Sequence, residues 1–277
     1  MPTASFSNIP APSEYFRLMF VGDIVARPGR RVIADWLPKA RHYYNPEVVI
    51  ANGENAAGGF GLDVRTAEEI FRSSVDVITL GNHVWDRKEI FSLLEREKAR
   101  LVRPANYPPD NPGTGMTIWT GHSGFRLGVM NLIGRVFIPG ALDCPFLAAD
   151  RLIEEHSPHY DALFVDMHAE ATSEKKALAW HLAGRAAAVI GTHTHTQTAD
   201  EVIIEGKTAY LSDVGMTGPH EGIIGFAQEE VVERFITGRN SRLEPAKGRT
   251  QINAVVVDIC RESGEARGIY RINEVTK

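Results

Sequence analysis

Residues that can bind metal ions or transfer protons follow five short apolar runs, at residues 18–21, 48–51, 77–80, 162–165 and 187–190. They are Asp23 after the first run, Glu54 and Asn55 after the second, Asn82 and His83 after the third, Asp166 and His168 after the fourth, and His193 and His195 after the fifth. A single apolar run followed by such a polar residue is typical of an ordinary turn. Five together predict a site, because a core would not bury so many polar groups without partners, and sites form where strands end.

The types of these side chains predict a pair of metal ions. The expected ligands are two carboxylates, two amides and three imidazoles: Asp23, Glu54, Asn55, Asn82, His168, His193 and His195. Seven ligands are too many for one ion with an open position, whereas two ions about 3.5–4 Å apart that share a bridging carboxylate would use them well. Three imidazoles favour iron, manganese, zinc or cobalt over magnesium or calcium, without separating those four.

Two details of this set depend on strand geometry. His193 and His195 are separated by one residue, so in a regular strand both imidazoles would face the same side. Asp166 precedes His168 by two residues, and two interpretations stay open: it holds His168 by a hydrogen bond or it approaches the ions directly. Arg27, Arg30 and the neighbouring Arg31 are likewise open to two interpretations, as phosphate-binding groups or as the solvated face of a helix.

The elements that must position these residues alternate along the chain. Amphipathic segments at 28–44, 63–73, 88–95, 150–155 and from 173 onward predict helices between the apolar runs, and 117–119 with 125–131 predict a hairpin. Strand-like segments follow at 201–204, 208–211, 253–258 and 268–272. Continuous apolar runs between helices indicate strands buried on both faces, and the strand-rich second half indicates a second sheet. We expect a single α/β domain over residues 16–277, preceded by a flexible extension at residues 1–15 rich in proline and serine.

Composition limits the binding partners and the cellular location that we expect for this chain. The chain has 277 residues and a net charge of −5, which predicts no extended nucleic-acid surface but leaves a small nucleotide or a short RNA end as a ligand. Its two cysteines, Cys144 and Cys260, have no metal-like spacing and favour a reducing, cytoplasmic location. No apolar run approaches the roughly 20 residues that cross a bilayer, so we expect no membrane partner.

Longer strings around these residues resemble a known family. GD at 22–23, GEN at 53–55, GNH at 81–83, the histidine of DMHAE at 168 and GTHTH at 191–195 resemble the metallophosphoesterase signature set. More narrowly, GDIVARPGRRV, NGENAAGGFGL, HAEATSEK and SDVGMTGP are similar to the bacterial YmdB-type phosphodiesterases, in consistent order from about residue 16 to 218. Many members of the wider superfamily carry histidine where this chain has Val25, and a bridging aspartate where it has Glu54; both departures agree with the narrower family.

The resemblance implies a four-layer α/β/β/α metallophosphoesterase sandwich, a dinuclear and usually iron-containing centre, and a homo-oligomer, either dimer or tetramer. It implies hydrolysis of phosphodiesters, notably 2′,3′-cyclic nucleotides, by a hydroxide that bridges the ions. The implied roles are Asp23, Asn55 and His195 on one ion, Asn82, His168 and His193 on the other, Glu54 as the bridge and His83 as the proton donor. Two alternatives stay open: a phosphomonoesterase on the same site, and a regulatory protein that controls an RNA-processing partner.

Overall fold

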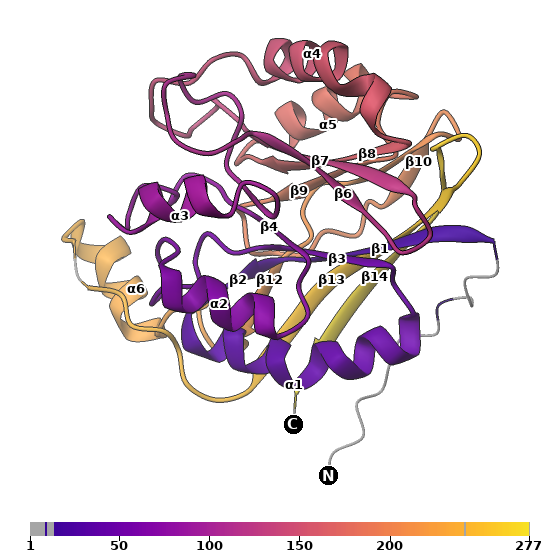
Figure 1. Cartoon of the computed structure of the whole chain (residues 1–277). Coiled ribbons are helices and arrows are strands. Elements are labelled where there is room, and N and C mark those ends of the chain that lie inside the picture. The colour runs from indigo at the N-terminus through magenta and orange to yellow at the C-terminus, as the bar shows by residue number, and fades with distance from the viewer. Residues whose placement is uncertain (1–8, 10–13, 241, 277) are drawn as a thin grey trace.

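Two β-sheets pack face to face, and helices cover the outer face of each sheet (Figure 1). The computed structural model describes residues 9, 14–240 and 242–276. Three large apolar clusters of buried residues fill the spaces between the four layers: one under the first set of helices, one between the sheets and one under the second set. Each layer thus buries an apolar face against its neighbour. The predicted four-layer α/β/β/α sandwich in one domain is confirmed.

The first sheet has eight strands in the order β2-β12-β13-β1-β3-β4-β5, with β14 beside β13. Their bounds are β1 Tyr15–Val21, β2 Asp23–Ile24, β3 Val48–Asn52, β4 Val77–Thr79, β5 Leu101–Val102, β12 Met216–Pro219, β13 Thr250–Cys260 and β14 Ala266–Val275. Strands β1, β3, β4 and β5 are parallel neighbours, whereas β13 runs antiparallel to β1. The carboxyl ends of β1, β3 and β4 therefore lie at the same edge.

Helices α1 Ala26–Tyr44 and α2 Val64–Arg72 cover the outer face of this sheet. Helix α3, Ile90–Arg96, adds Ile90, Leu93 and Leu94 to the same core cluster. The apolar stripe predicted on α1 is buried, including Ile33 and Leu37. Asp63 caps α2, because its carboxylate accepts a hydrogen bond of 2.7 Å from the amide of Thr66. Both helices therefore begin close to the predicted positions, directly after the loops that carry Asp23 and Glu54.

The second sheet has six strands in the order β10-β11-β9-β8-β7-β6. Their bounds are β6 Met116–Thr120, β7 Arg126–Ile133, β8 Ala162–His168, β9 Ala188–Thr192, β10 Val202–Ile204 and β11 Thr208–Leu211. Strands β7, β8 and β9 are parallel neighbours, and β6 forms the predicted hairpin with β7. Helices α4 Pro145–His156 and α5 Thr172–His181 cover its outer face, with the short 3-10 helix Ser157–His159 after α4.

Helix α6, Gln228–Thr237, was not predicted from the sequence. It lies outside the four layers, on an arm next to α1 and α2 (Figure 1). Its apolar residues Val231, Val232, Phe235 and Ile236 recur at helical spacing, so the sequence carried a signal that was overlooked. Of these side chains only Val231 is buried, and the other three, such as Phe235, face solvent. Strands β2, β5 and β12 were also missed. Runs of two residues, as in β2 and β5, are too short to show periodicity, and β12 ends in Gly-Pro, which is typical of a turn.

Several predictions concern regions or properties outside this architecture. Residues 1–8 and 10–13 of the predicted extension lie outside the described residues; Ile9 is buried against the first core cluster, and β1 already begins at Tyr15. Among the described residues, no helix combines the length and apolar character needed to cross a membrane. A boundary at residue 16, a homo-oligomer and a cytoplasmic location stay predictions.

Candidate metal centre

The strand ends of the two sheets meet at one place, and the predicted residues lie there. Glu54 follows β3, Asn82 follows β4, His168 is the last residue of β8 and His193 follows β9. Asp23 opens β2, directly after β1. The pairing of parallel strands within each sheet brings these ends to one edge, as expected for sites in α/β proteins.

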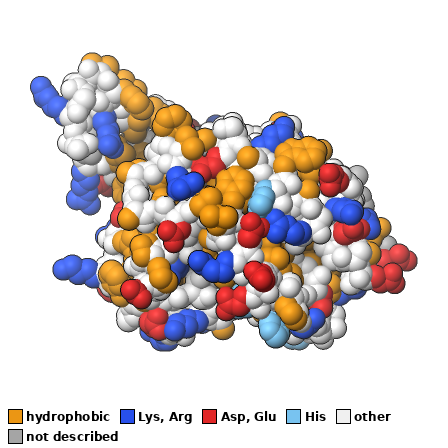
Figure 2. Space-filling view, turned by 90° about the horizontal axis from the view of Figure 1, so that it is seen from above, with side chains coloured by type: hydrophobic (Ala, Val, Ile, Leu, Met, Phe, Trp, Pro, Cys, Tyr) orange, Lys and Arg blue, Asp and Glu red, His pale blue; other side chains and the backbone are white. Residues whose placement is uncertain are grey.

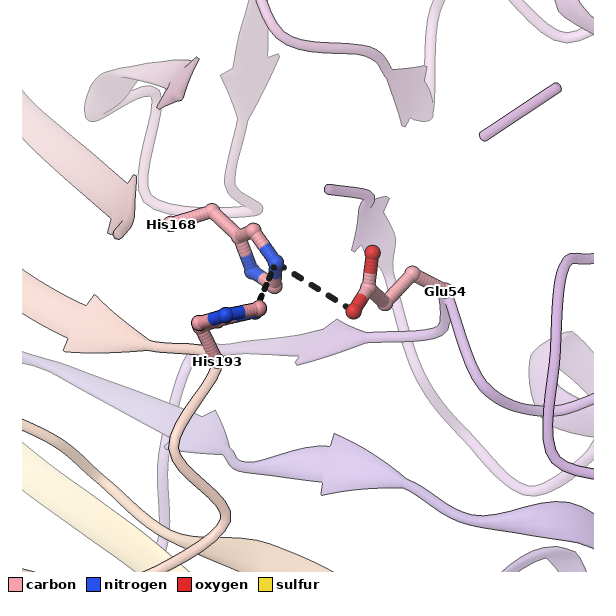
Figure 3. Close-up of side chains that lie close together, drawn as sticks. All are labelled: Glu54, His168 and His193. Carbon is pink, nitrogen blue, oxygen red and sulfur yellow. Dashed lines mark hydrogen bonds and ion pairs between the residues drawn. The ribbon is translucent and has the colours of Figure 1, made fainter. Parts of the chain in front are cut away.

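Three potential ligands converge on one nitrogen of His168. Its Nε2 atom lies 2.8 Å from Oδ1 of Asn82, 3.1 Å from Nδ1 of His193 and 3.2 Å from Oε1 of Glu54. Figure 3 shows that the side chains of His168, His193 and Glu54 point toward one another. Ligand atoms of these last three residues all lie within 4.8 Å of one another, close enough to hold one ion.

The remaining predicted ligands join the same network. The amide Nδ2 of Asn55 lies 3.2 Å from Oε1 of Glu54 and 3.0 Å from Nε2 of His195. Asp23 accepts a hydrogen bond of 3.2 Å from the backbone amide of His193 through Oδ2. All seven predicted ligands are thus linked by direct contacts. To bind a metal, Asn55 must turn its amide by half a rotation, because an amide coordinates through oxygen.

Hydrogen bonds behind two imidazoles decide which nitrogen faces the site. Nδ1 of His168 donates to Oγ1 of Thr192 at 2.9 Å, since that hydroxyl itself donates to Asp166 at 2.7 Å. Nδ1 of His195 donates to the carbonyl oxygen of Ile224 at 2.9 Å. Both Nε2 atoms therefore face the site and can offer a lone pair to a metal ion, as metal-binding imidazoles require. Asp166 holds His168 through Thr192, which corrects the interpretation of a direct hydrogen bond; a direct approach of Asp166 to the ions stays a prediction.

The electrostatics of these groups fit a cation. Burial disfavours the charged form of His168, but the Glu54 carboxylate outweighs burial and raises the pKa of that imidazole to about 9. Burial likewise opposes ionisation of Glu54, yet His168 holds the pKa of this carboxyl well below its usual value. In the absence of a metal ion, Nε2 of His168 must carry a proton, because lone pairs of Asn82, His193 and Glu54 point at it. A metal ion would replace that proton.

Asp23 supports the same conclusion independently. Its side chain is fully buried, and Oδ1 has no hydrogen-bond partner among the described residues. Burial raises the pKa of this carboxyl well above its usual value. A buried, unpartnered carboxylate oxygen is costly unless something positive occupies the adjacent space. The donor set and this oxygen together fit the divalent ions that the fold implies.

The backbone around His193 and His195 differs from the prediction. Strand β9 ends at Thr192, and both histidines follow it with φ angles of 101° and 63°. The expectation that they alternate within a regular strand was wrong, although both rings reach the site. Such left-handed conformations cost about 1–3 kcal/mol for a residue with a side chain and are typical of functional sites. The lost alternation shows that the loop, rather than the strand, aims these imidazoles.

Gly81 leaves room for the ligands. A Cβ atom at this position would lie 2.4 Å from Oε2 of Glu54 and 2.4 Å from Nε2 of His168. Any larger residue would therefore displace a carboxylate and an imidazole of the site. The glycine of the GNH string acts here by its small size.

His83 lies beside the ligands without joining them. Its backbone amide donates to Oε2 of Glu54 at 3.0 Å, and its Nδ1 lies 2.8 Å from Oδ2 of Asp86. Its ring packs edge-on against Phe60, with 5.0 Å between ring centroids, and 28% of its side chain is exposed. Because the Asp86 carboxylate accepts from Nδ1, Nε2 is the atom able to exchange a proton with a ligand.

Sequence reasoning missed three polar partners in this site. Thr192 orients His168, Asp86 pairs with His83, and Oε2 of Glu170 lies 3.3 Å from Nε2 of His193. Each lies within three residues of a predicted site residue along the chain. Proximity to a ligand was thus the available signal, but it does not tell which neighbour turns inward.

The layered fold and the ligand-bearing strand ends define this chain as a metallophosphoesterase-type protein. Comparison with protein families gives a more specific assignment: the sequence model of the YmdB-like protein family matches residues 19–272. The chain belongs to the YmdB-like family, which confirms the resemblance read from its motifs. A 2′,3′-cyclic-nucleotide 2′-phosphodiesterase of Bacillus subtilis is 48% identical over 92% of this chain and 96% of the relative.

Solved structures agree with this assignment. A protein of Thermus thermophilus described as hypothetical has a TM-score of 0.88 and 44% identity, and the match covers 94% of this chain and 100% of that one. A structure described as a novel phosphatase of Mycoplasma pneumoniae also has a TM-score of 0.88, with 31% identity over 95% and 94% of the two chains. The predicted enzyme class, a metal-dependent phosphoric diester hydrolase, is confirmed by this family membership.

Proposed function

We propose that this chain hydrolyses 2′,3′-cyclic nucleotides at a dinuclear metal centre. The observation that carries the proposal is the convergence of Asn82, His193 and Glu54 on Nε2 of His168. The unpartnered Oδ1 of Asp23 supports a second ion nearby. The substrate comes from the name of the Bacillus subtilis relative, whose whole length this chain nearly spans.

The contacts support one division of the ligands between the two ions. Asn82, His168 and His193 would hold one ion, because they meet around a single nitrogen. The other would bind to Asp23, Asn55 and His195. Glu54 contacts both groups through Oε1 and would form the bridge. We propose iron, with manganese, zinc or cobalt as alternatives that suit the same ligands. Bound there, the ions would supply Lewis acidity and water acidic enough to act as hydroxide at neutral pH.

The proton for the leaving ribose oxygen would come from His83. Asp86 accepts a hydrogen bond from Nδ1 and orients the ring, while Nε2 is left to donate. The backbone contact between His83 and Glu54 fixes the donor relative to the proposed bridge. Phe60 covers one side of the ring and limits its rotation.

The test combines metal content with substrate preference. Protein purified without oxygen should contain two metal ions per chain and should hydrolyse 2′,3′-cyclic AMP faster than 3′,5′-cyclic AMP or a phosphomonoester. The Glu54→Gln variant should lose metal and activity together. Less than one ion per chain under every loading condition would refute the metal centre.

A phosphomonoesterase is the second candidate. The name of the Mycoplasma pneumoniae structure favours it, because that protein is described as a phosphatase. Both activities would use the same ions, so they differ in which ester fits. A metal-loaded protein that cleaves the monoester and leaves every diester intact would favour this candidate over the cyclic-nucleotide assignment.

A further inference from the structure

A cavity lined with arginine lies beside the metal centre, between the helices of the first layer and the arm that carries α6. Its volume is about 1230 Å³. Eight arginines line it, against two glutamates. Figure 2 shows this arm at the upper left, standing out from the body of the molecule and carrying Lys and Arg side chains. A chain with a net charge of −5 thus concentrates positive charge in one place.

Three of these arginines are available to bind an anion. Within the described residues, Arg27 and Arg31 of α1 and Arg234 of α6 form no ion pair and donate no side-chain hydrogen bond. All three are exposed. Guanidinium groups bind phosphate in a two-pronged geometry and retain their charge at every relevant pH. Unpaired guanidinium groups around one cavity would therefore attract phosphate groups.

Other arginines hold the cavity wall rather than offering free charge. Arg30 pairs with Glu69 at 2.5 Å and donates to the carbonyl oxygen of Ala56. Arg87 donates to the carbonyl oxygens of Ala57 and Phe60. These contacts fix the loop at 56–60, which directly follows Glu54 and Asn55. The wall of the cavity and the ligands of the metal centre are therefore parts of one rigid segment.

Phe60 joins the cavity to the catalytic residues. Its ring lines the cavity, packs edge-on against His83 and stacks on Phe226 with ring centroids 5.2 Å apart. Nucleic-acid bases stack on aromatic rings at such positions, with about 1–3 kcal/mol per base. Phe60 thus lies between the cavity and His83, and a ligand that reached both places would pass its ring.

We propose that this cavity binds the 5′-side phosphates of an oligoribonucleotide whose terminal 2′,3′-cyclic phosphate occupies the metal centre. The inference rests on the proposed function for the terminal group alone; the binding of the chain is independent of hydrolysis. The proposal develops the alternative that net charge left open, a short RNA end as a ligand without an extended nucleic-acid surface. Short RNA ends, rather than free mononucleotides, are then the preferred substrate class.

The size of the cavity favours an oligonucleotide over a small polyphosphate. Sites for small ligands usually measure about 300–1000 Å³, and this cavity is larger. Its charge is distributed over α1, α2 and the α6 arm instead of meeting at one point. Such a spread suits phosphates that succeed one another along a backbone.

The experiment compares two charge-reversed proteins. In one, Arg31→Glu and Arg234→Glu alter opposite walls of the cavity. In the matched control, Arg151→Glu and Lys176→Glu make the same charge change at exposed positions of α4 and α5, on the far outer layer. Binding of a fluorescent hexaribonucleotide with a 3′-phosphate is measured by anisotropy on metal-free protein, and circular dichroism confirms that each variant is folded.

We expect the cavity variant to bind the hexamer at least about tenfold more weakly than the control, with a smaller dependence on salt. In metal-loaded protein, its ratio of kcat/KM for a hexamer ending in a cyclic phosphate over 2′,3′-cyclic AMP should fall by a similar factor. Equal hexamer binding by the two variants would overturn the proposal, as would ATP competing as strongly as the hexamer. If no cyclic phosphate is hydrolysed but the binding difference persists, the proposed function fails and the cavity assignment stands.

Discussion

Replacing Gly81 with alanine should remove the metal centre while leaving the fold intact. The added Cβ would lie 2.4 Å from both Oε2 of Glu54 and Nε2 of His168, whereas ordinary contacts begin at 3.4 Å. Both groups must therefore withdraw by about 1 Å, and a misplacement of this size costs roughly 100-fold in activity. We expect Gly81→Ala to lose that much kcat/KM and to retain less than half of the bound metal.

The assay needs three readouts on the same preparation: metal content by mass spectrometry, hydrolysis of 2′,3′-cyclic AMP and thermal unfolding. Gly121→Ala is the matched control, because it adds the same methyl group against the ring of Trp119, far from the site. Wild-type metal content and activity in Gly81→Ala would show that the strand-end geometry described above does not hold the ions. A lower melting temperature in both variants would trace the change to backbone effects instead.

Three further predictions follow from named contacts. His83→Ala should retain both metals and lose about 10²–10⁴-fold in kcat, and Asp86→Asn should lose less; unchanged turnover would remove His83 from its role. Lys175→Met should remove the ammonium that lies 2.8 Å from the buried Asp213 carboxylate and leave that charge with only the backbone amides of Thr194 and Gly215 as donors. Losing the ion-pair partner of a buried charge costs about 3–5 kcal/mol and should lower the melting temperature by at least about 6 °C. Because the pKa of His168 is raised to about 9 in metal-free protein, a metal ion must displace a proton below that pH. Metal affinity should thus rise with pH and level off above pH 9; calorimetry in buffers of different ionisation enthalpy would detect the released proton, and a pH-independent affinity would contradict the reasoning.

Most of the fold could be predicted because its signals are local. Apolar runs of four or more residues between amphipathic segments correctly marked β1, β3, β4, β8 and β9. Elements whose stability comes from elsewhere gave no such signal. Strand β2 has two residues and is held by β12, nearly 200 residues away along the chain. Helix α6, in contrast, carries an apolar stripe that was overlooked, and the structure leaves most of that stripe facing solvent.

The candidate site likewise has features that local sequence determines and features that depend on tertiary structure. The sequence by itself determined the ligand types and the strand ends that carry them, because both are written in short motifs such as GNH and GTHTH. Tertiary structure alone decided that Thr192 lies between His168 and Asp166, and that Gly81 passes over Glu54. These relations join residues on different strands, whose mutual distances depend on sheet packing.

The arginine cavity shows the same limit most clearly. Arg31 and Arg234 are about 200 positions apart in the sequence, yet both line one cavity. The total charge of the chain, −5, says nothing about such a local excess because it averages over the whole surface. Sequence reasoning identified what could bind a phosphate at the strand ends. Only the tertiary structure places arginines of α1, α2 and the α6 arm around one cavity.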